Sequence, residues 1–311
     1  MPRLPNHSRA REKYIEEHTL LFNKNIIDAQ GVLAEDIDLL IATLTTTNGM
    51  VDNSTKNMLI VAQIDSIYAA FAEDQGIELM DDFIDRTDGL FNLNEDYFNS
   101  ASDVAGSIFD RAKNFAKDSV YTAMGYSLAT GALTANGSLS NILTSTGPID
   151  AVKSSLFSAI ANNLLLTDVR SGIQTITTGT KDTKGSFERH IDATMSQPLE
   201  KFDRATGRQF SLGLELNHAF YQGGLVPASR DFCTVRNGNV YSREEISRFG
   251  TSADQYGGYT NKGAGEFQGK FNSGYNPFTD LGGYNCLHIL TWISDELAYQ
   301  FRPDLRPPSA T

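Results

Sequence analysis

Cysteine, long apolar runs and basic charge are all scarce in this sequence of 311 residues. Two cysteines are too few for a small secreted scaffold that is cross-linked by several disulfides. No stretch reaches the about 18 uninterrupted apolar residues that a membrane-spanning helix needs, and the first residues lack the apolar core of a signal peptide. We therefore expect a protein that has no membrane-spanning segment and is made in a cytoplasm.

The shortage of basic charge is confined to one part of the chain. The 26 Lys and Arg are outnumbered by 38 Asp and Glu, so the net charge is −12. Residues 1–179 hold 12 basic and 23 acidic residues, whereas residues 180–311 hold 14 and 15. Because phosphate contacts need clustered Lys and Arg, this balance argues against nucleic-acid binding over the whole surface. The acidic part is interpreted either as a solvated helical surface or as a face that repels DNA or docks on a basic partner.

Helical periodicity dominates the first 180 residues. Apolar residues recur at alternating steps of three and four from Ile15 to Leu44, and they include Leu40. This seam predicts one long helix, packed within the chain or paired with a second copy. The stretch 128–148 is rich in Gly, Ser, Thr and Asn, which is typical of a loop or of small-residue helix contacts. Further helices are predicted at 54–76, 77–87, 95–127, 149–177 and 186–206.

Glycine and aromatic residues become dense after Gly207, and helical periodicity fades. Residues 219–284 are therefore expected to form short strands and long loops. The segment around Cys233 is predicted as a strand that continues through an Asn237-Gly238 turn into a second strand. A closing helix is predicted at about 288–300.

One helix start in this region has a specific signal, because Ser242 is followed three residues later by Glu245. This is a capping-box pattern and predicts a helix from about 243 to 249. The expected fold class is thus α+β and mainly helical. An acidic helical arm or bundle at 1–180 precedes a small α+β domain at 181–311, which has short strands and long loops rich in Gly and aromatic residues.

Both cysteines lie in the second domain, in two short motifs that follow the aromatic-glycine run 220–224. These motifs contain Arg230, Cys233, Gly238, Gly283, Asn285, Cys286 and His288. The pattern resembles the C-terminal domain of phage minor head proteins, the head morphogenesis family that includes the F protein of phage Mu. The resemblance covers about residues 186–295, and it departs from the family at Leu287, where an Arg is usual.

The resemblance implies a structural protein of a tailed bacteriophage, with no catalytic residue and no cofactor. Such a protein would be located in the virion, inside the head or at the portal vertex, and would aid head assembly, DNA packaging or DNA delivery. Its expected partners are the portal protein, the major capsid protein or both, with self-association through the N-terminal helix and contact with packaged DNA as further expectations. Two alternatives are an internal cargo or ejection protein not bound to the portal, and a metal- or cysteine-dependent enzyme such as a nuclease or a toxin-related domain.

The chemistry of the motif residues leaves several interpretations open. Cys233, Cys286 and His288 are candidate zinc ligands, with His218 or Asp231 as a fourth ligand. Their spacing lacks the close cysteine pairs of most zinc sites, so the sequence favours no metal. The two cysteines form a close pair, as thiols or a disulfide, or they are separate buried thiols. A Cys286–His288 nucleophile pair is the enzymatic alternative.

Polar residues near the motifs give two further expectations. Arg230 and Asn285 are expected to join the two motif segments by hydrogen bonds, because polar groups beside a buried cysteine need partners. The basic residues of the second half stand among aromatics, a mixture that could contact DNA but is more simply a solvated surface. They include Arg204, Arg208, Arg230, Arg236, Arg243, Arg248, Lys262 and Lys270.

Overall fold

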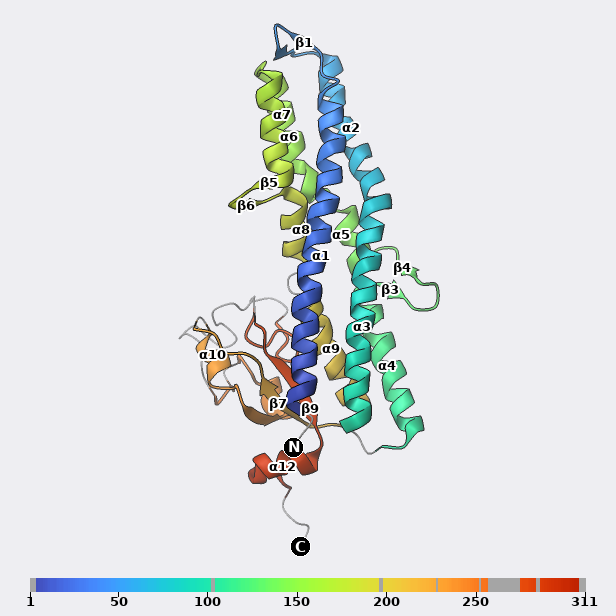
Figure 1. Cartoon of the computed structure of the whole chain (residues 1–311), viewed down its shortest axis with the longest axis vertical. Coiled ribbons are helices and arrows are strands. Elements are labelled where there is room, and N and C mark those ends of the chain that lie inside the picture. Colours follow the sequence, from blue (N-terminus) through green and yellow to red (C-terminus); the bar gives the residue numbers. More distant parts are fainter. Residues whose placement is uncertain are drawn as a thin grey trace. The chain divides into compact units, whose positions relative to one another are not determined.

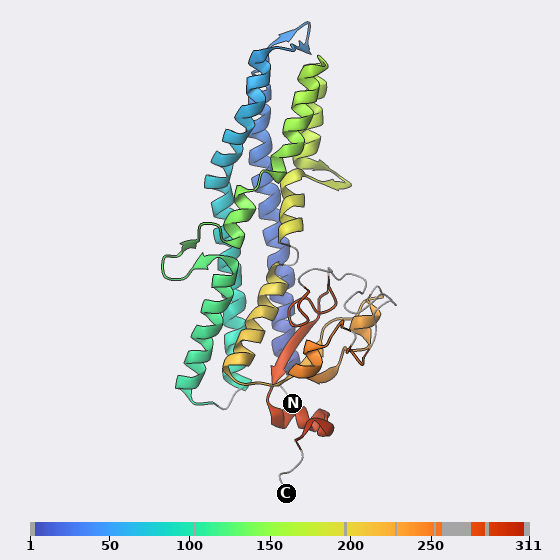
Figure 2. The ribbon, with the colours of Figure 1, turned by 180° about the vertical axis from the view of Figure 1, so that it is seen from behind.

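The structure of the protein is a computed structural model, in which helices form most of the chain (Figures 1 and 2). The strands of the described part make three two-stranded hairpins and one three-stranded sheet, so the predicted mainly helical α+β class is confirmed. The structure describes residues 4–101, 104–195, 198–227, 229–251, 253–256, 275–283 and 286–307.

The chain divides into two compact units, and each is discontinuous in sequence. Unit 1 comprises Met1–Glu16, Arg86–Ala123 and Gln197–Thr311, and unit 2 comprises Glu17–Asp85 and Met124–Ser196. The sequence suggested one boundary near residue 180 instead. Helices α1 (Leu4–Ile41) and α3 (Ile77–Ala101) each contribute residues to both units.

Unit 2 is helical apart from three small hairpins. Helix α6 packs against α2, α7 and α8. Besides its parts of α1 and α3, the unit contains α2 (Thr55–Phe71), the π-helix η1 (Ala72–Gly76), α5 (Ser138–Thr144), α6 (Gly147–Ala161), α7 (Leu166–Thr178) and α8 (Ser186–Thr194). Its hairpins are β1 (Thr46–Thr47) with β2 (Met50–Val51), β3 (Tyr126–Ser127) with β4 (Ala132–Leu133), and β5 (Gly179–Thr180) with β6 (Thr183–Lys184).

The apolar seam of α1 is buried within the chain. Phe22, Leu33 and Ile37 are each at most 2% exposed, and the Phe22 ring centroid lies 5.3 Å from that of Phe83 on α3. The long helix is confirmed, and its seam packs within the chain. The helix ends at Ile41, which takes the buried position that the heptad pattern had assigned to Leu40.

Several predicted helix boundaries in unit 2 are wrong. The helix predicted at 149–177 is two helices, because Asn163 between α6 and α7 adopts a φ of 50° and the left-handed conformation ends a helix. The stretch 128–148 holds the β4 strand and helix α5.

The start of α2 is as predicted, since the Ser54 hydroxyl accepts a hydrogen bond from the Asn57 N–H at 3.3 Å.

Unit 1 combines helices with an antiparallel sheet in the order β8-β7-β9. Helix α9 packs on β9 (Figure 1) and is buried along most of its length. The helix predicted at 186–206 is two helices in the structure, α8 in unit 2 and α9 in unit 1. Besides its parts of α1 and α3, the unit contains α4 (Gly106–Met124), α9 (Pro198–Gly213), β7 (His218–Gln222), α10 (Asp231–Thr234), β8 (Asn239–Ser242), α11 (Arg243–Ser247), β9 (Ile289–Ile293), α12 (Asp295–Phe301) and the 3-10 helix η2 (Pro303–Leu305).

The helices predicted at 77–87 and 95–127 have different limits in the structure. Helix α3 runs unbroken to Ala101, and α4 begins at Gly106. Gly89 in the middle of α3 lies against Tyr14 of α1, where a Cβ atom would come within 2.2 Å of the hydroxyl oxygen. That hydroxyl donates a hydrogen bond to the Arg86 carbonyl at 3.0 Å. The close contact between these helices explains a glycine at a position where it costs helix stability.

Two predictions for the C-terminal domain are wrong. Cys233 lies in the short helix α10, where its N–H donates to the Arg230 carbonyl, and β8 pairs with β7 instead of with the segment around Cys233. The predicted closing helix begins as strand β9 and becomes helical only at Asp295. All five residues of β9 are buried, and an apolar run buried on both faces shows no alternation that would distinguish a strand from a helix.

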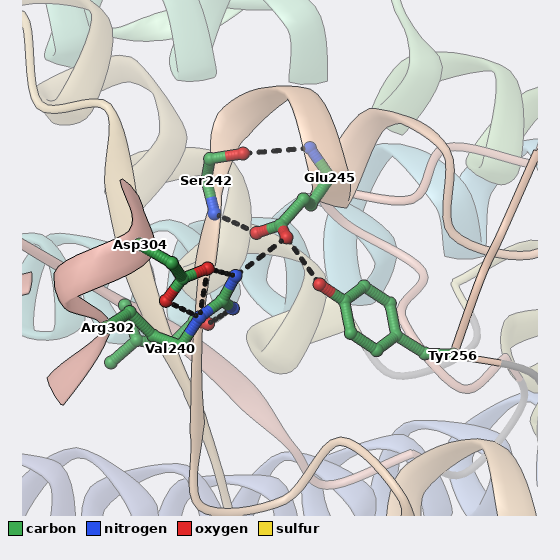
Figure 3. Close-up of polar contacts among 6 residues, drawn as sticks. All are labelled: Val240, Ser242, Glu245, Tyr256, Arg302 and Asp304. Atoms are coloured by element: carbon green, nitrogen blue, oxygen red, sulfur yellow. Dashed lines mark hydrogen bonds and ion pairs between the residues drawn. The ribbon is translucent and has the colours of Figure 1, made fainter. Parts of the chain in front are cut away.

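The capping box at the start of α11 is confirmed, and Figure 3 shows that it belongs to a larger polar network. The Ser242 N–H donates to Glu245 Oε2 at 2.7 Å, and the Glu245 N–H donates to the Ser242 hydroxyl at 3.1 Å. Glu245 Oε1 also accepts from the Tyr256 hydroxyl and from Arg302. Arg302 in turn donates to the Val240 carbonyl at 2.9 Å, so one carboxylate connects β8, α11 and the residues after α12.

This network predicts a pH-dependent stability. Burial raises the pKa of Glu245, but hydrogen bonds from Tyr256, the Ser242 N–H and Arg302 outweigh it and leave the pKa below its ordinary value of 4.5. A carboxyl with a lowered folded-state pKa stabilises the fold above its unfolded pKa, and this contribution disappears as the pH falls. We expect Glu245→Gln to lower the free energy of unfolding by about 1 kcal/mol at pH 7, and the difference from wild type to shrink below pH 4.5.

The measurement is urea denaturation of both proteins across that pH range. Glu244→Gln is the matched control, because the Glu244 side chain is 75% exposed and pairs with Arg248 on the surface. An exposed pair on one helix contributes little. A Glu245→Gln difference that stays constant from neutral to acid pH would contradict the proposed role of the charge.

Candidate functional site

The two cysteine motifs meet in a buried cluster of unit 1. Cys233 of α10 and Cys286, which precedes β9, have their sulfur atoms 3.6 Å apart. His288 Nδ1 lies 3.8 Å from Cys286 Sγ. The Tyr221 hydroxyl of β7 donates to Cys233 Sγ at 3.5 Å and lies 4.0 Å from Cys286 Sγ. The two cysteines form no disulfide, and no member of the cluster is more than 3% exposed.

Two glycines allow the backbone to approach this cluster closely. A Cβ atom on Gly282 would lie 2.4 Å from Cys233 Sγ and 3.0 Å from Cys286 Sγ, and the Gly282 N–H donates to Cys286 Sγ at 3.3 Å. A Cβ atom on Gly223 would lie 2.8 Å from the His288 Cα atom. The aromatic-glycine run and the Gly282-Gly283 pair are therefore parts of the same site.

The side chain of Arg204 of α9 binds backbone carbonyl groups in and beside the second motif segment. Its guanidinium donates to the His288 carbonyl at 3.0 Å, to the Thr279 carbonyl at 2.9 Å and to the Cys286 carbonyl. Arg204 is 3% exposed. One buried cation thus satisfies three carbonyl oxygens around the cluster, which fixes the backbone that carries Cys286 and His288.

The two thiols titrate as a pair. The hydrogen bond from Cys233 lowers the pKa of Cys286 well below its ordinary value; burial opposes this, and His288 and Arg204 reinforce it. The hydrogen bond to Cys286 and burial raise the pKa of Cys233, and burial raises that of Tyr221. Of the two sulfurs, Cys286 is therefore the one that loses its proton more readily.

His288 has a second ring nitrogen that faces away from this hydrogen-bonded pair. Its Nε2 atom is buried and has no hydrogen-bond partner among the residues that the structure describes. Glu12 of α1 is within electrostatic reach of His288. The described cluster therefore combines two cysteine sulfurs and an imidazole, which are groups that soft metal ions bind.

Other predicted site residues have different roles or lie outside the described residues. His218 Nδ1 lies 2.7 Å from Asp295 Oδ1, so it is the structural hydrogen-bonding group of another pair, and neither it nor Asp231 joins the described cluster. Gly238 and Gly283 have φ angles of 81° and 82°, which favour glycine.

The predicted link between Arg230 and Asn285 is not tested, because Asn285 lies outside the described residues. The Arg230 carbonyl accepts hydrogen bonds from the Cys233 and Thr234 N–H groups at the start of α10. The backbone of Arg230 therefore positions the first cysteine.

The prediction of a solvated basic surface is wrong for two arginines. Arg204 is buried as described above, and Arg236 is completely buried. Arg236 pairs with buried Asp254 and lies over the Phe232 ring, 3.8 Å from its centroid. Neither residue is available to DNA. Lys262 and Lys270 lie outside the described residues.

Tyr221 and Arg204 are site residues that the sequence reasoning did not identify. The signal for Tyr221 was its place in the aromatic-glycine run, which pairs with β9 beside the second motif. No local signal identifies Arg204, because its three acceptors lie at least 75 positions away along the chain.

Unit 2 contains a separate cavity of about 530 Å³ beside the π-helix η1. Its lining includes Tyr68, whose buried hydroxyl has no hydrogen-bond partner among the described residues. Gly76 at the end of η1 lies close to Leu143 of α5, because a Cβ atom on this glycine would come within 3.0 Å of a Leu143 methyl. More than half of the lining residues are apolar, and none of them belongs to the cysteine–histidine cluster.

No family model, curated protein or solved structure matches the chain. Among the described residues, no helix is both long enough and apolar enough to cross a membrane.

Proposed function

We propose that the protein is a structural minor head protein of a tailed bacteriophage that associates with the portal inside the capsid. In this role it aids head assembly, DNA packaging or DNA delivery. One observation supports the proposal: three of the residues on which the family resemblance depends, Cys233, Cys286 and His288, form a single buried cluster although the two cysteines lie 53 positions apart. Motif residues that converge in a core are typical of a shared fold.

Burial of the cluster also favours a structural role over an enzymatic one. Cys233, Cys286 and His288 are between 2% and 3% exposed. A catalytic thiolate must reach its substrate, and reactive cysteines are partly exposed for this reason. The sulfur atom of Cys286 is enclosed by Gly282, Tyr221 and the other two members of the cluster.

The acidic N-terminal region supports a protein partner more than DNA. Nearly all of the excess of acidic residues lies in the first 179 residues, and an acidic surface repels phosphate. We therefore propose the portal as the main partner, with the acidic region docking on a basic protein surface.

The test is co-expression of the full chain with the portal protein encoded beside its gene. We expect the portal to co-purify with the chain, and the yield to fall as salt rises, because the proposed contact is ionic. The major capsid protein expressed alone with the chain is the control. Mass spectrometry of purified particles should find the chain in few copies per virion.

Two results would decide against the proposal. Absence of the chain from the particle would exclude any virion role. Its presence in the particle without portal binding would favour the alternative of an internal cargo or ejection protein.

A further inference from the structure

We propose that Cys233, Cys286 and His288 bind one zinc ion, which joins helix α10 to the segment before strand β9. The inference concerns the folded chain itself and is independent of the proposed role in a phage. Three donor atoms of the types that zinc prefers converge here, two thiol sulfurs and one imidazole nitrogen. All three lie within 4.8 Å of one another.

The distances fit a tetrahedral ion. Zinc bonds of about 2.3 Å to sulfur and about 2.0 Å to nitrogen place two sulfurs about 3.8 Å apart, and a sulfur about 3.5 Å from a nitrogen. The two sulfur atoms are 3.6 Å apart, and Cys286 Sγ is 3.8 Å from His288 Nδ1. Two of the three separations thus match a tetrahedral ion to within about 0.3 Å. The third, between Cys233 Sγ and the His288 ring nitrogen, lies within 4.8 Å and would close toward about 3.5 Å when the ion binds.

The surroundings suit metal-bound sulfur. The Gly282 N–H and the Tyr221 hydroxyl both donate to sulfur atoms of the cluster, and hydrogen bonds of this kind orient and stabilise the ligands of a metal. Gly282 has no side chain that would occupy the space beside the sulfurs. The Tyr221 hydroxyl lies 3.5 Å from Cys233 Sγ and 4.0 Å from Cys286 Sγ, so it is next to both sulfur ligands.

The second ring nitrogen of His288 is left over for an outer contact. A ligating histidine usually presents its other nitrogen to a carboxylate or a carbonyl. With Nδ1 directed at Cys286, Nε2 of His288 is the atom left for such a contact. A zinc ion would also explain why three metal-binding groups are kept together in a core, where two thiols and an imidazole otherwise gain little.

The sequence spacing did not favour this site because the first ligand comes from another segment. Cys286 and His288 are two positions apart, and Cys233 is 53 positions from Cys286. In most zinc sites the four ligands come as two pairs, and the two members of each pair are close in sequence. Here the β7–β9 pairing and α10 bring the separate ligand into place.

The experiment is metal analysis of the full chain, produced in zinc-supplemented medium and purified without chelators. We expect about one zinc per chain in the wild type. We expect zinc affinity to fall more than about 100-fold in Cys286→Ser and in His288→Gln. This is more than the about 10–100-fold loss that follows when only an outer contact of a metal ligand is removed. His190→Gln is the matched control, because His190 belongs to unit 2, where its Nε2 atom lies 3.0 Å from the Ile142 carbonyl oxygen, and its loss should leave the zinc content unchanged.

A second measurement avoids dependence on variants that fail to fold. Cobalt(II) added to metal-free wild-type protein should give the intense visible bands of a tetrahedral site and a thiolate-to-cobalt charge-transfer band. Wild-type protein that holds no zinc and gives no such spectrum would overturn the proposal. So would a Cys233–Cys286 disulfide in freshly purified protein, or unchanged zinc content in Cys233→Ser/Cys286→Ser.

Discussion

Asp203→Ala is expected to destabilise unit 1 by about 3–5 kcal/mol, because it leaves the buried Arg11 charge without its partner. Asp203 of α9 is completely buried and Arg11 of α1 is 1% exposed. Arg11 Nε donates to Asp203 Oδ1 at 2.7 Å, and a second nitrogen donates to the other oxygen. The same Oδ1 accepts from Asn94 of α3 at 2.8 Å, so one carboxylate connects three helices.

The control for this variant is Asp38→Ala in unit 2. Arg170 makes the same bidentate pair with Asp38, but the side chain of Arg170 is 47% exposed and that of Asp38 is 40% exposed. Water replaces the lost partner at such a site, so we expect a change of about 0–1 kcal/mol. Chemical denaturation of both variants beside wild type measures the difference. Equal losses would show that burial does not determine the contribution of the pair.

A third variant separates the charge from the packing. Arg11→Met/Asp203→Leu removes both charges together, and replacing a buried pair by apolar residues is often neutral. We expect it to recover most of the stability that Asp203→Ala loses. If it is as unstable as the single variant, then the hydrogen bond to Asn94 or the packing of α9 is the main contribution.

Local patterns explain which parts of the fold could be predicted. The α1 seam was recognisable because its buried residues repeat along one helix, and the helix start at Ser242 because both capping residues lie within one turn. Strand β9 was mistaken for a helix because burial on both faces removes the alternation. The position of Asp203 in the core was not predictable, since its partner Arg11 lies 192 positions away.

The candidate site was predictable only in its motif residues. Cys233, Cys286 and His288 were identified, but the sequence could not show that α10 and β9 bring their donor atoms within 4.8 Å of one another. Apart from Tyr221, whose hydroxyl contacts both sulfurs, the parts that it missed act through the backbone. Gly282 provides space and an N–H group, and Arg204 binds carbonyl oxygens, so neither has a pattern in the sequence.

Arg204→Met is expected to lower the free energy of unfolding by about 3 kcal/mol, because it leaves two buried carbonyl oxygens and one part-buried carbonyl oxygen without their donor, at about 1 kcal/mol each. These oxygens belong to Thr279, Cys286 and His288, and the methionine keeps most of the apolar volume of the arginine stem. Arg204→Lys should recover only part of the loss, since an ammonium lacks the planar fork that reaches several acceptors. Arg189→Met in unit 2 is the matched control, because Arg189 donates to the Lys184 carbonyl at an exposed site.

The same variant distinguishes a positioning role from general stabilisation. Arg204 touches no ligand atom of the proposed zinc site, but it holds the carbonyls of Cys286 and His288. We expect zinc affinity to fall about 10–100-fold in Arg204→Met, the range for loss of an outer contact, and less in Arg204→Lys. Zinc titration of the folded variants, compared with their denaturation curves, measures both effects. If Arg204 orients the cluster, its loss shifts the backbone that carries Cys286 and His288, which supply two of the three zinc donor atoms. Lost stability with unchanged zinc affinity would therefore mean that Arg204 supports the core without orienting the cluster.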